Sequence, residues 1–226
     1  MDHQLLDRSL AILAMLAAIV VGLMVFGIVF TASSQDFFQS ARLPEAYAAY
    51  AARPRAELGL RINLGLDNFF VVIYGAFFTL LAARFRGLLD GRIVGVALAA
   101  MMLTALLDAY ENHHILTMVH SLGNGLPVAV SEGQGQMVAS QIKFHASYLS
   151  VLLFSFGFLS FGRLGRITLA ALWAYVPFGV LISVTPPELA KPLVLLRTIF
   201  FSGAFVLTAI LFFREARARG DGAPAE

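Results

Sequence analysis

Six apolar segments of the chain are each about as long as a lipid bilayer is thick. A helix that crosses the hydrocarbon core of about 30 Å needs roughly 20 apolar residues. Segments of this kind cover residues 10–31, 67–83, 93–118, 141–161, 167–184 and 192–213. We therefore predict an all-α fold, a polytopic membrane helical bundle. It forms a single integral membrane domain over residues 1–226, with a flexible C-terminal tail at 215–226.

The composition agrees with this class of protein. The 226 residues are 59% hydrophobic and 13% charged, whereas soluble domains carry about 25% charged residues. The absence of cysteine excludes disulfides, thiolate metal sites and thiol nucleophiles. The basic residues lie mostly between the apolar segments and form no stripe with aromatic residues, which excludes a nucleic-acid surface. Membrane lipid is the expected partner, and a homo-oligomer remains open.

The first apolar segment is interpreted as an uncleaved anchor, because it exceeds the 7–15-residue core of a signal peptide. Arginines cluster at 84–92, 163–166 and 214–219, whereas residues 119–140 contain neither Lys nor Arg. The positive-inside rule then predicts that both termini are cytoplasmic, in a bacterial-type inner membrane. Four arginines between the first two segments run against this orientation.

The connections between the segments also carry signals. Residues 43–52 predict a short helix with a proline near its first turn. Tyr47 and Tyr50 share one face of it and are expected at the level of the lipid headgroups. Residues 123–127 and 133–135 are rich in glycine, which is typical of turns and flexible loops.

Several ionisable residues lie inside the predicted spans. On the third segment, Asp108, Glu111 and Asn112 have the i, i+3, i+4 spacing that places them on one helix face. Residues on four segments lie at a similar depth: Asp67, Asn68, Tyr74, Asp108, Glu111, Asn112, His114, Lys143, His145 and Arg197. A charge at the centre of a membrane helix costs about 2.5–3.5 kcal/mol. We therefore expect these groups to face one another around a pocket open toward the outer leaflet, with opposite charges paired.

This constellation predicts a membrane-embedded enzyme that acts on a lipid or lipid-like substrate by acid/base or metal-assisted chemistry. The expected catalytic residues are Asp108, Glu111, His114, Lys143 and His145, and the expected substrate-binding residues are Asp67, Asn68, Tyr74, Asn112 and Arg197.

A metal is one route to such chemistry. The spacing of Glu111 and His114 occurs in carboxylate-bridged metal sites of helical bundles. With Asp108 and His145 it would give a mixed oxygen and nitrogen site for a divalent cofactor such as zinc.

Two other functions remain open on the residues alone. In a proton- or ion-coupled transporter or channel of small solutes, Asp108 and Glu111 would bind a cation or carry the proton. The cytoplasmic halves of the segments hold few polar residues, which favours a one-sided site over an open channel. In a non-catalytic helical subunit or assembly factor, the same charges would pair with each other or with a partner.

Overall fold

The computed structural model of the chain describes residues 2–39 and 44–220, with side chains at all of these except 187 and 188. Leu43, the first residue of the predicted short helix, and residues 221–226 of the predicted tail lie outside the described residues. Within these ranges the chain is helical apart from turns and short connections, and no strand occurs. The predicted all-α fold is confirmed.

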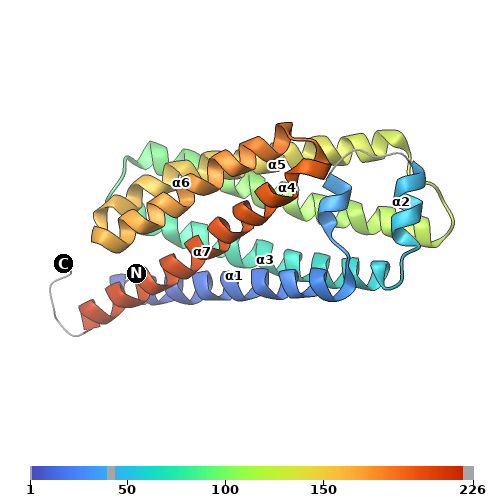
Figure 1. Cartoon of the computed structure of the whole chain (residues 1–226). Helices are drawn as coiled ribbons and strands as arrows, with labels where there is room; N and C mark the ends of the chain where they lie inside the picture. Colours follow the sequence, from blue (N-terminus) through green and yellow to red (C-terminus); the bar gives the residue numbers. More distant parts are fainter. Residues whose placement is uncertain (1, 40–43, 221–226) are drawn as a thin grey trace. The chain divides into compact units, whose positions relative to one another are not determined.

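Seven α-helices and two short 3-10 helices follow one another along the described chain (Figure 1). In order they are α1 (His3–Thr31), η1 (Gln35–Gln39), α2 (Pro44–Ala51), α3 (Ala56–Phe85), α4 (Gly91–Gly123), α5 (Val130–Ser155), η2 (Phe156–Ser160), α6 (Gly162–Val184) and α7 (Pro187–Gly220). Helices α1, α3, α4, α5, α6 and α7 contain the six stretches long and apolar enough to cross a bilayer. The chain is a polytopic integral membrane protein.

The helices are longer than the predicted spans. Helix α3 begins at Ala56 rather than near Asp67, and α5 begins at Val130 rather than near Gln141. At 1.5 Å per residue the 30 residues of α3 cover about 45 Å. The predicted flexible loop at residues 133–135 is wrong, because these residues lie inside α5. Continuing the helix satisfies backbone groups close to lipid, which outweighs the low helix propensity of glycine there.

The chain forms two compact units. Unit 1 comprises Met1–Ile19, Val72–Leu103 and Phe144–Glu226, and unit 2 comprises Val20–Val71 and Thr104–Lys143. Each unit therefore combines segments that are distant in the sequence.

The core of unit 2 contains the aromatic residues of η1 and α2. Phe38 and Tyr47 are fully buried, and their rings stack with centroids 5.5 Å apart. Tyr50 is also buried, and its hydroxyl donates to the Ser34 carbonyl at 3.0 Å. Burial raises the pKa of this hydroxyl above its ordinary value, so that Tyr50 remains a neutral donor. The rings of Tyr47 and Tyr50 therefore pack against other core side chains of unit 2, and their expected depth at the lipid headgroups stays a prediction.

Small residues bring α1 and α3 close together in unit 2. A Cβ atom on Gly59 would collide with Thr31 Oγ1, and one on Gly27 would lie 2.6 Å from Asn63 Oδ1. Asn63 Nδ2 also donates to the Ser33 carbonyl at 3.1 Å. These contacts fix the position of α3 along α1. Asp67 follows Asn63 by one helical turn on α3, so its position is fixed as well.

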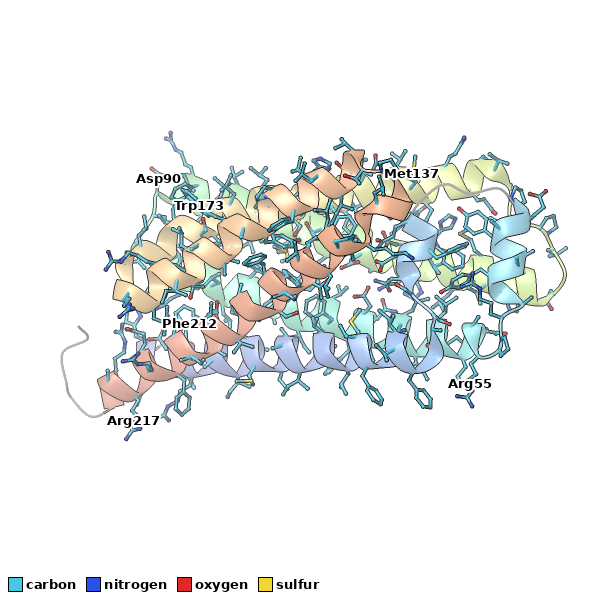
Figure 2. All side chains as sticks on the ribbon, viewed as in Figure 1. Arg55, Asp90, Met137, Trp173, Phe212 and Arg217 are labelled. Atoms are coloured by element: carbon cyan, nitrogen blue, oxygen red, sulfur yellow. The ribbon has the colours of Figure 1, made fainter. Side chains whose placement is uncertain are left out.

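Unit 1 is held by helix packing and aromatic contacts. Helix α6 packs along α7, and Phe77 of α3 contacts Phe205 of α7 edge to face at a centroid distance of 5.6 Å. Trp173 of α6, labelled in Figure 2, donates its indole N–H to Ser155 Oγ at 2.8 Å.

A buried ion cluster joins three helices of unit 1. Asp7 of α1 is fully buried and contacts Arg84 of α3 at 2.8 Å and Arg219 of α7 at 3.1 Å. Because a buried carboxylate is stable only when its charge is compensated, Asp7 fixes the three helices relative to one another.

Candidate functional site

Lys143 of α5 connects two acidic residues of α4. Its Nζ atom donates hydrogen bonds to Asp108 Oδ1 at 2.8 Å and to Glu111 Oε1 at 2.9 Å. The side chain of Glu111 is fully buried, and those of Lys143 and Asp108 are 4% and 11% exposed. Asp108 and Glu111 are one helical turn apart, which lets one ammonium group reach both carboxylates. The predicted pairing of opposite charges is confirmed for these three residues.

Glu111 is held by two further donors. Gln39 Nε2 of η1 donates to Glu111 Oε1 at 2.8 Å. The hydroxyl of Ser140, one turn before Lys143 on α5, donates to Glu111 Oε2. Both carboxylate oxygens therefore have hydrogen-bond donors, as an ionised buried carboxylate requires.

Asp67 of α3 is bound in a different way. Its Oδ2 atom accepts hydrogen bonds from Asn112 Nδ2 at 2.8 Å and from Gln35 Nε2 at 3.3 Å. Asn112 Nδ2 also lies 3.2 Å from Asn68 Oδ1. Asp67 is 4% exposed. Within the described part of the chain its hydrogen-bond donors are neutral amides, whereas Asp108 and Glu111 receive hydrogen bonds from an ammonium group.

Carboxyl groups outnumber ammonium and guanidinium groups in the contacts that the structure describes at this site. Asp67 lies near enough to Asp108 and Lys143 for direct electrostatic interaction with both. Among the described contacts, Lys143 is the cation that Asp108 and Glu111 bind directly, and Asp67 is a third carboxyl group nearby. Three arginines of unit 2 contact groups elsewhere: Arg53 the Tyr50 ring, Arg55 the Phe30 ring and Arg61 the Glu57 carboxylate.

Two amide oxygens beside Asp67 are buried without a hydrogen-bond partner among the described residues. They are Gln35 Oε1 and Asn112 Oδ1, whose amide groups both donate to Asp67. A buried acceptor without a donor costs about 1–3 kcal/mol. The surroundings of Asp67 therefore contain unused acceptor capacity.

His114 lies apart from the carboxylates of its own helix. Its Nδ1 atom is 2.7 Å from Gln136 Oε1 of α5, and its ring stacks on Tyr110 with centroids 5.8 Å apart. Gln136 is fully buried, and His114 is partly buried. The geometry assigns His114 to a hydrogen bond between α4 and α5.

The predicted metal site is not supported. In the described ranges no three His, Asp or Glu side chains gather so that they could hold a metal ion, the set Asp108, Glu111, His114 and His145 included. The ammonium group of Lys143 occupies the position between the two carboxylates where an ion would bind. His145 follows Lys143 by two residues, about 200° around the helix, and therefore points away from the face that carries Lys143.

Three predicted site residues belong to unit 1. Tyr74 is buried. His145 is exposed, with its ring 5.8 Å from that of Tyr148. The guanidinium group of Arg197 lies over the Phe144 ring at 4.4 Å. Unit 2 therefore contains the predicted residues Asp67, Asn68, Asp108, Glu111, Asn112, His114 and Lys143.

Four residues of the site were not predicted from the sequence. Gln35 and Gln39 belong to η1, and Gln136 and Ser140 belong to the first half of α5. The glutamines of η1 lie next to two phenylalanines and gave no periodic signal. Ser140 does have a periodic signal: it precedes Lys143 by three residues and therefore shares its helix face.

The chain was compared with known proteins in three ways. No family model matches it. No curated protein matches it. No solved structure matches it.

Proposed function

We propose that this chain is a membrane proton transporter, in which Asp67 takes up and releases the proton. The observation that carries the proposal is the excess of buried carboxyl groups around Lys143. Full ionisation of Asp67, Asp108 and Glu111 would leave uncompensated negative charge in a buried part of the protein, which is costly. One added proton lowers that cost, so this site favours proton binding.

Asp67 is the best candidate for the proton among the three acids. Asp108 and Glu111 both accept hydrogen bonds from the ammonium group of Lys143, which stabilises their ionised form. Asp67 accepts hydrogen bonds from amides. The unpaired oxygens of Gln35 and Asn112 offer acceptors to a proton-carrying group when the side chains rearrange.

The geometry gives less support to the predicted lipid-modifying enzyme. Lys143 and Glu111 are almost completely buried and are bonded to each other, so neither is exposed to a substrate. A purely structural subunit also fits less well, because a charge cluster that only holds helices together would be expected to balance its charges. Buried ionisable groups in membrane spans mark proton relays in pumps and transporters.

Asp67→Asn is expected to abolish proton binding at the site, since an amide cannot take up the proton. The purified wild-type protein should show the infrared carbonyl band of a protonated carboxylic acid, which disappears as the pH is raised. In the variant this band should be lost. Reconstituted wild-type protein should also carry protons into liposomes down an imposed pH gradient, and the variant should not.

The matched control is Asp36→Asn, which changes an exposed acid of η1. It should leave both the infrared band and the proton flux unchanged. An unaltered pH-dependent band in Asp67→Asn would refute the role of Asp67. Proton flux in wild-type liposomes no faster than in protein-free liposomes would refute transport.

We further propose that both termini are cytoplasmic in a bacterial-type inner membrane. The support is the distribution of the arginines, which cluster at 84–92, 163–166 and 214–219 and are absent from 119–140. In this orientation the turn that joins α4 to α5, at residues 124–129, faces the outside.

A single cysteine tests this orientation, because the natural sequence contains none. Leu126→Cys, at an exposed position of that turn, should react with an impermeant thiol reagent in intact cells. Leu88→Cys, in the turn between α3 and α4, should react only after lysis. The reverse pattern would invert the topology. Gly133 is unsuited to the probe, because a Cβ atom there would lie 2.6 Å from the Tyr47 hydroxyl.

A further inference from the structure

The oxygen atoms around Asp67 outnumber the hydrogen-bond donors that the structure gives them. Both hydrogen bonds that Asp67 accepts end on Oδ2, from Asn112 Nδ2 at 2.8 Å and from Gln35 Nε2 at 3.3 Å. Asp67 Oδ1 accepts none from the described residues. Asn112 Oδ1 and Gln35 Oε1 are buried and also have no donor among them. We call these three residues, together with Asn68, the Asp67 amide site.

Rotation of the Asn112 amide does not remove this shortage of donors. It would break the hydrogen bond to Asp67 and the contact with Asn68 Oδ1 at 3.2 Å. The Asn112 oxygen would then face the Asp67 oxygen, and neither atom is a donor. Asn112 is fully buried and Asp67 is 4% exposed, so bulk water has little access to them. The missing donors therefore have to come from a bound species.

The oxygens without a donor lie close enough together to contact one small molecule. The nitrogen and oxygen of an amide are about 2 Å apart, so each amide oxygen of Gln35 and Asn112 lies within about 6 Å of Asp67 Oδ2. Asn68 Oδ1, next to Asn112 Nδ2, is a fourth acceptor. Two oxygens that accept from the same nitrogen are about 5 Å apart when each hydrogen bond is about 2.8 Å long. These spacings suit a single nitrogen-centred donor.

The charges around Asp67 favour a cation as this donor. Asp67 forms no ion pair with a described residue. The ammonium group of Lys143 on α5 interacts with Asp67 only at longer range, because it is hydrogen-bonded to Asp108 and Glu111 of α4. Asp108 also acts on Asp67, and its charge is of the same sign. A ligand with one positive charge therefore matches the ionised form of Asp67.

We propose that ionised Asp67 and the amide oxygens of Asn112, Gln35 and Asn68 bind an ammonium ion. Ammonium carries a single positive charge and can donate one N–H group to each of these four oxygens. An alkali-metal ion would need a fuller shell of oxygens to replace its water, and a divalent ion would need more carboxylates. The proposal deepens the proposed function and rests on it, because release of the proton frees the Asp67 carboxylate for a second cation.

Isothermal titration calorimetry of the detergent-purified full chain with ammonium chloride tests this proposal. Sodium chloride and potassium chloride at equal ionic strength serve as reference salts, and neutral pH keeps the ligand as ammonium rather than ammonia. Wild-type protein should bind ammonium saturably and the alkali ions weakly. In Asn112→Leu and in Gln35→Met the affinity should fall about tenfold or more, because each variant loses a hydrogen bond to a charged ligand. Asp67→Asn should abolish binding.

The matched control is Asn124→Leu, which removes an exposed amide in the turn after α4 and should leave the affinity unchanged. Gln35 is only partly buried, so Gln35→Met provides the test if Asn112→Leu does not fold. Wild-type affinity in Gln35→Met would overturn the proposal, and so would equally tight binding of sodium or potassium.

The infrared carbonyl band of protonated Asp67 separates this inference from the proposed function. Wild-type protein that shows the pH-dependent band but binds no ammonium would overturn the ammonium site and leave proton binding in place. Wild-type protein that binds ammonium but shows no such band would support the ammonium site and refute the role of Asp67 in carrying the proton.

Discussion

Lys143→Met is expected to lower the free energy of unfolding by about 3–5 kcal/mol, the usual cost of removing one partner from a buried ion pair. Methionine retains most of the aliphatic stem of lysine but removes the ammonium group that contacts Asp108 at 2.8 Å and Glu111 at 2.9 Å. Two carboxylates would then remain close together without this ammonium group. Reversible unfolding in mixed micelles, followed by circular dichroism, measures the change.

A compensated variant separates the loss of charge balance from the loss of packing. In Asp108→Asn/Glu111→Gln/Lys143→Met all three charges are absent, and most of the stability should return, because uncharged side chains of similar size replace the ion pairs. A destabilisation below about 1 kcal/mol in Lys143→Met would mean that the ammonium group does not compensate buried carboxylates, since exposed ion pairs contribute no more than this.

Asp7→Asn is expected to destabilise the protein by about 3 kcal/mol or more, because it leaves Arg84 buried without a carboxylate. Asparagine has nearly the same shape as aspartate, so the effect isolates the charge. The same unfolding assay applies. Glu57→Gln is the control, since its partner Arg61 and Glu57 itself are about half exposed and such pairs contribute about 0–1 kcal/mol. Equal effects of the two substitutions would contradict a structural role for the Asp7 cluster.

The helices of the fold follow from the sequence because membrane-spanning segments are long and apolar. A helix is the one element that satisfies its own backbone in lipid, so each predicted span coincides with a helix. The ends of the helices did not follow from hydropathy. Helices α3 and α5 continue into residues such as Arg61 and Gln136, which are polar but compatible with a helix.

The candidate site was predictable where helical periodicity determines which residues share a helix face. The spacing of Asp108, Glu111 and Asn112 placed them on one face, and the structure directs this face to Lys143 and Asp67. Gln35 and Gln39 were not predictable, because a 3-10 helix between two spans has no pattern that reveals its neighbours. His145 was included in the predicted site only because of its expected depth in the membrane. Its angular position around α5, about 200° from Lys143, directs its side chain away from the face that carries Lys143.

The burial of Tyr47 and Tyr50 has a related explanation. Amphipathic aromatic side chains suit both a headgroup layer and a protein interior in which the hydroxyl finds a partner. Tyr50 finds that partner in Ser34, which lies 16 residues earlier in the chain. Local sequence does not distinguish these environments, because the difference depends on a contact between distant segments.

The single tryptophan of the chain gives its fluorescence one origin. Trp173 belongs to unit 1, where its indole N–H is bonded to Ser155 and its ring meets Phe156 edge to face at 5.9 Å. Excitation at wavelengths that tyrosine does not absorb therefore reports on the surroundings of Trp173 in α6. The emission spectrum of the native chain is a built-in probe of unit 1, and a tryptophan introduced into unit 2 would give a second signal.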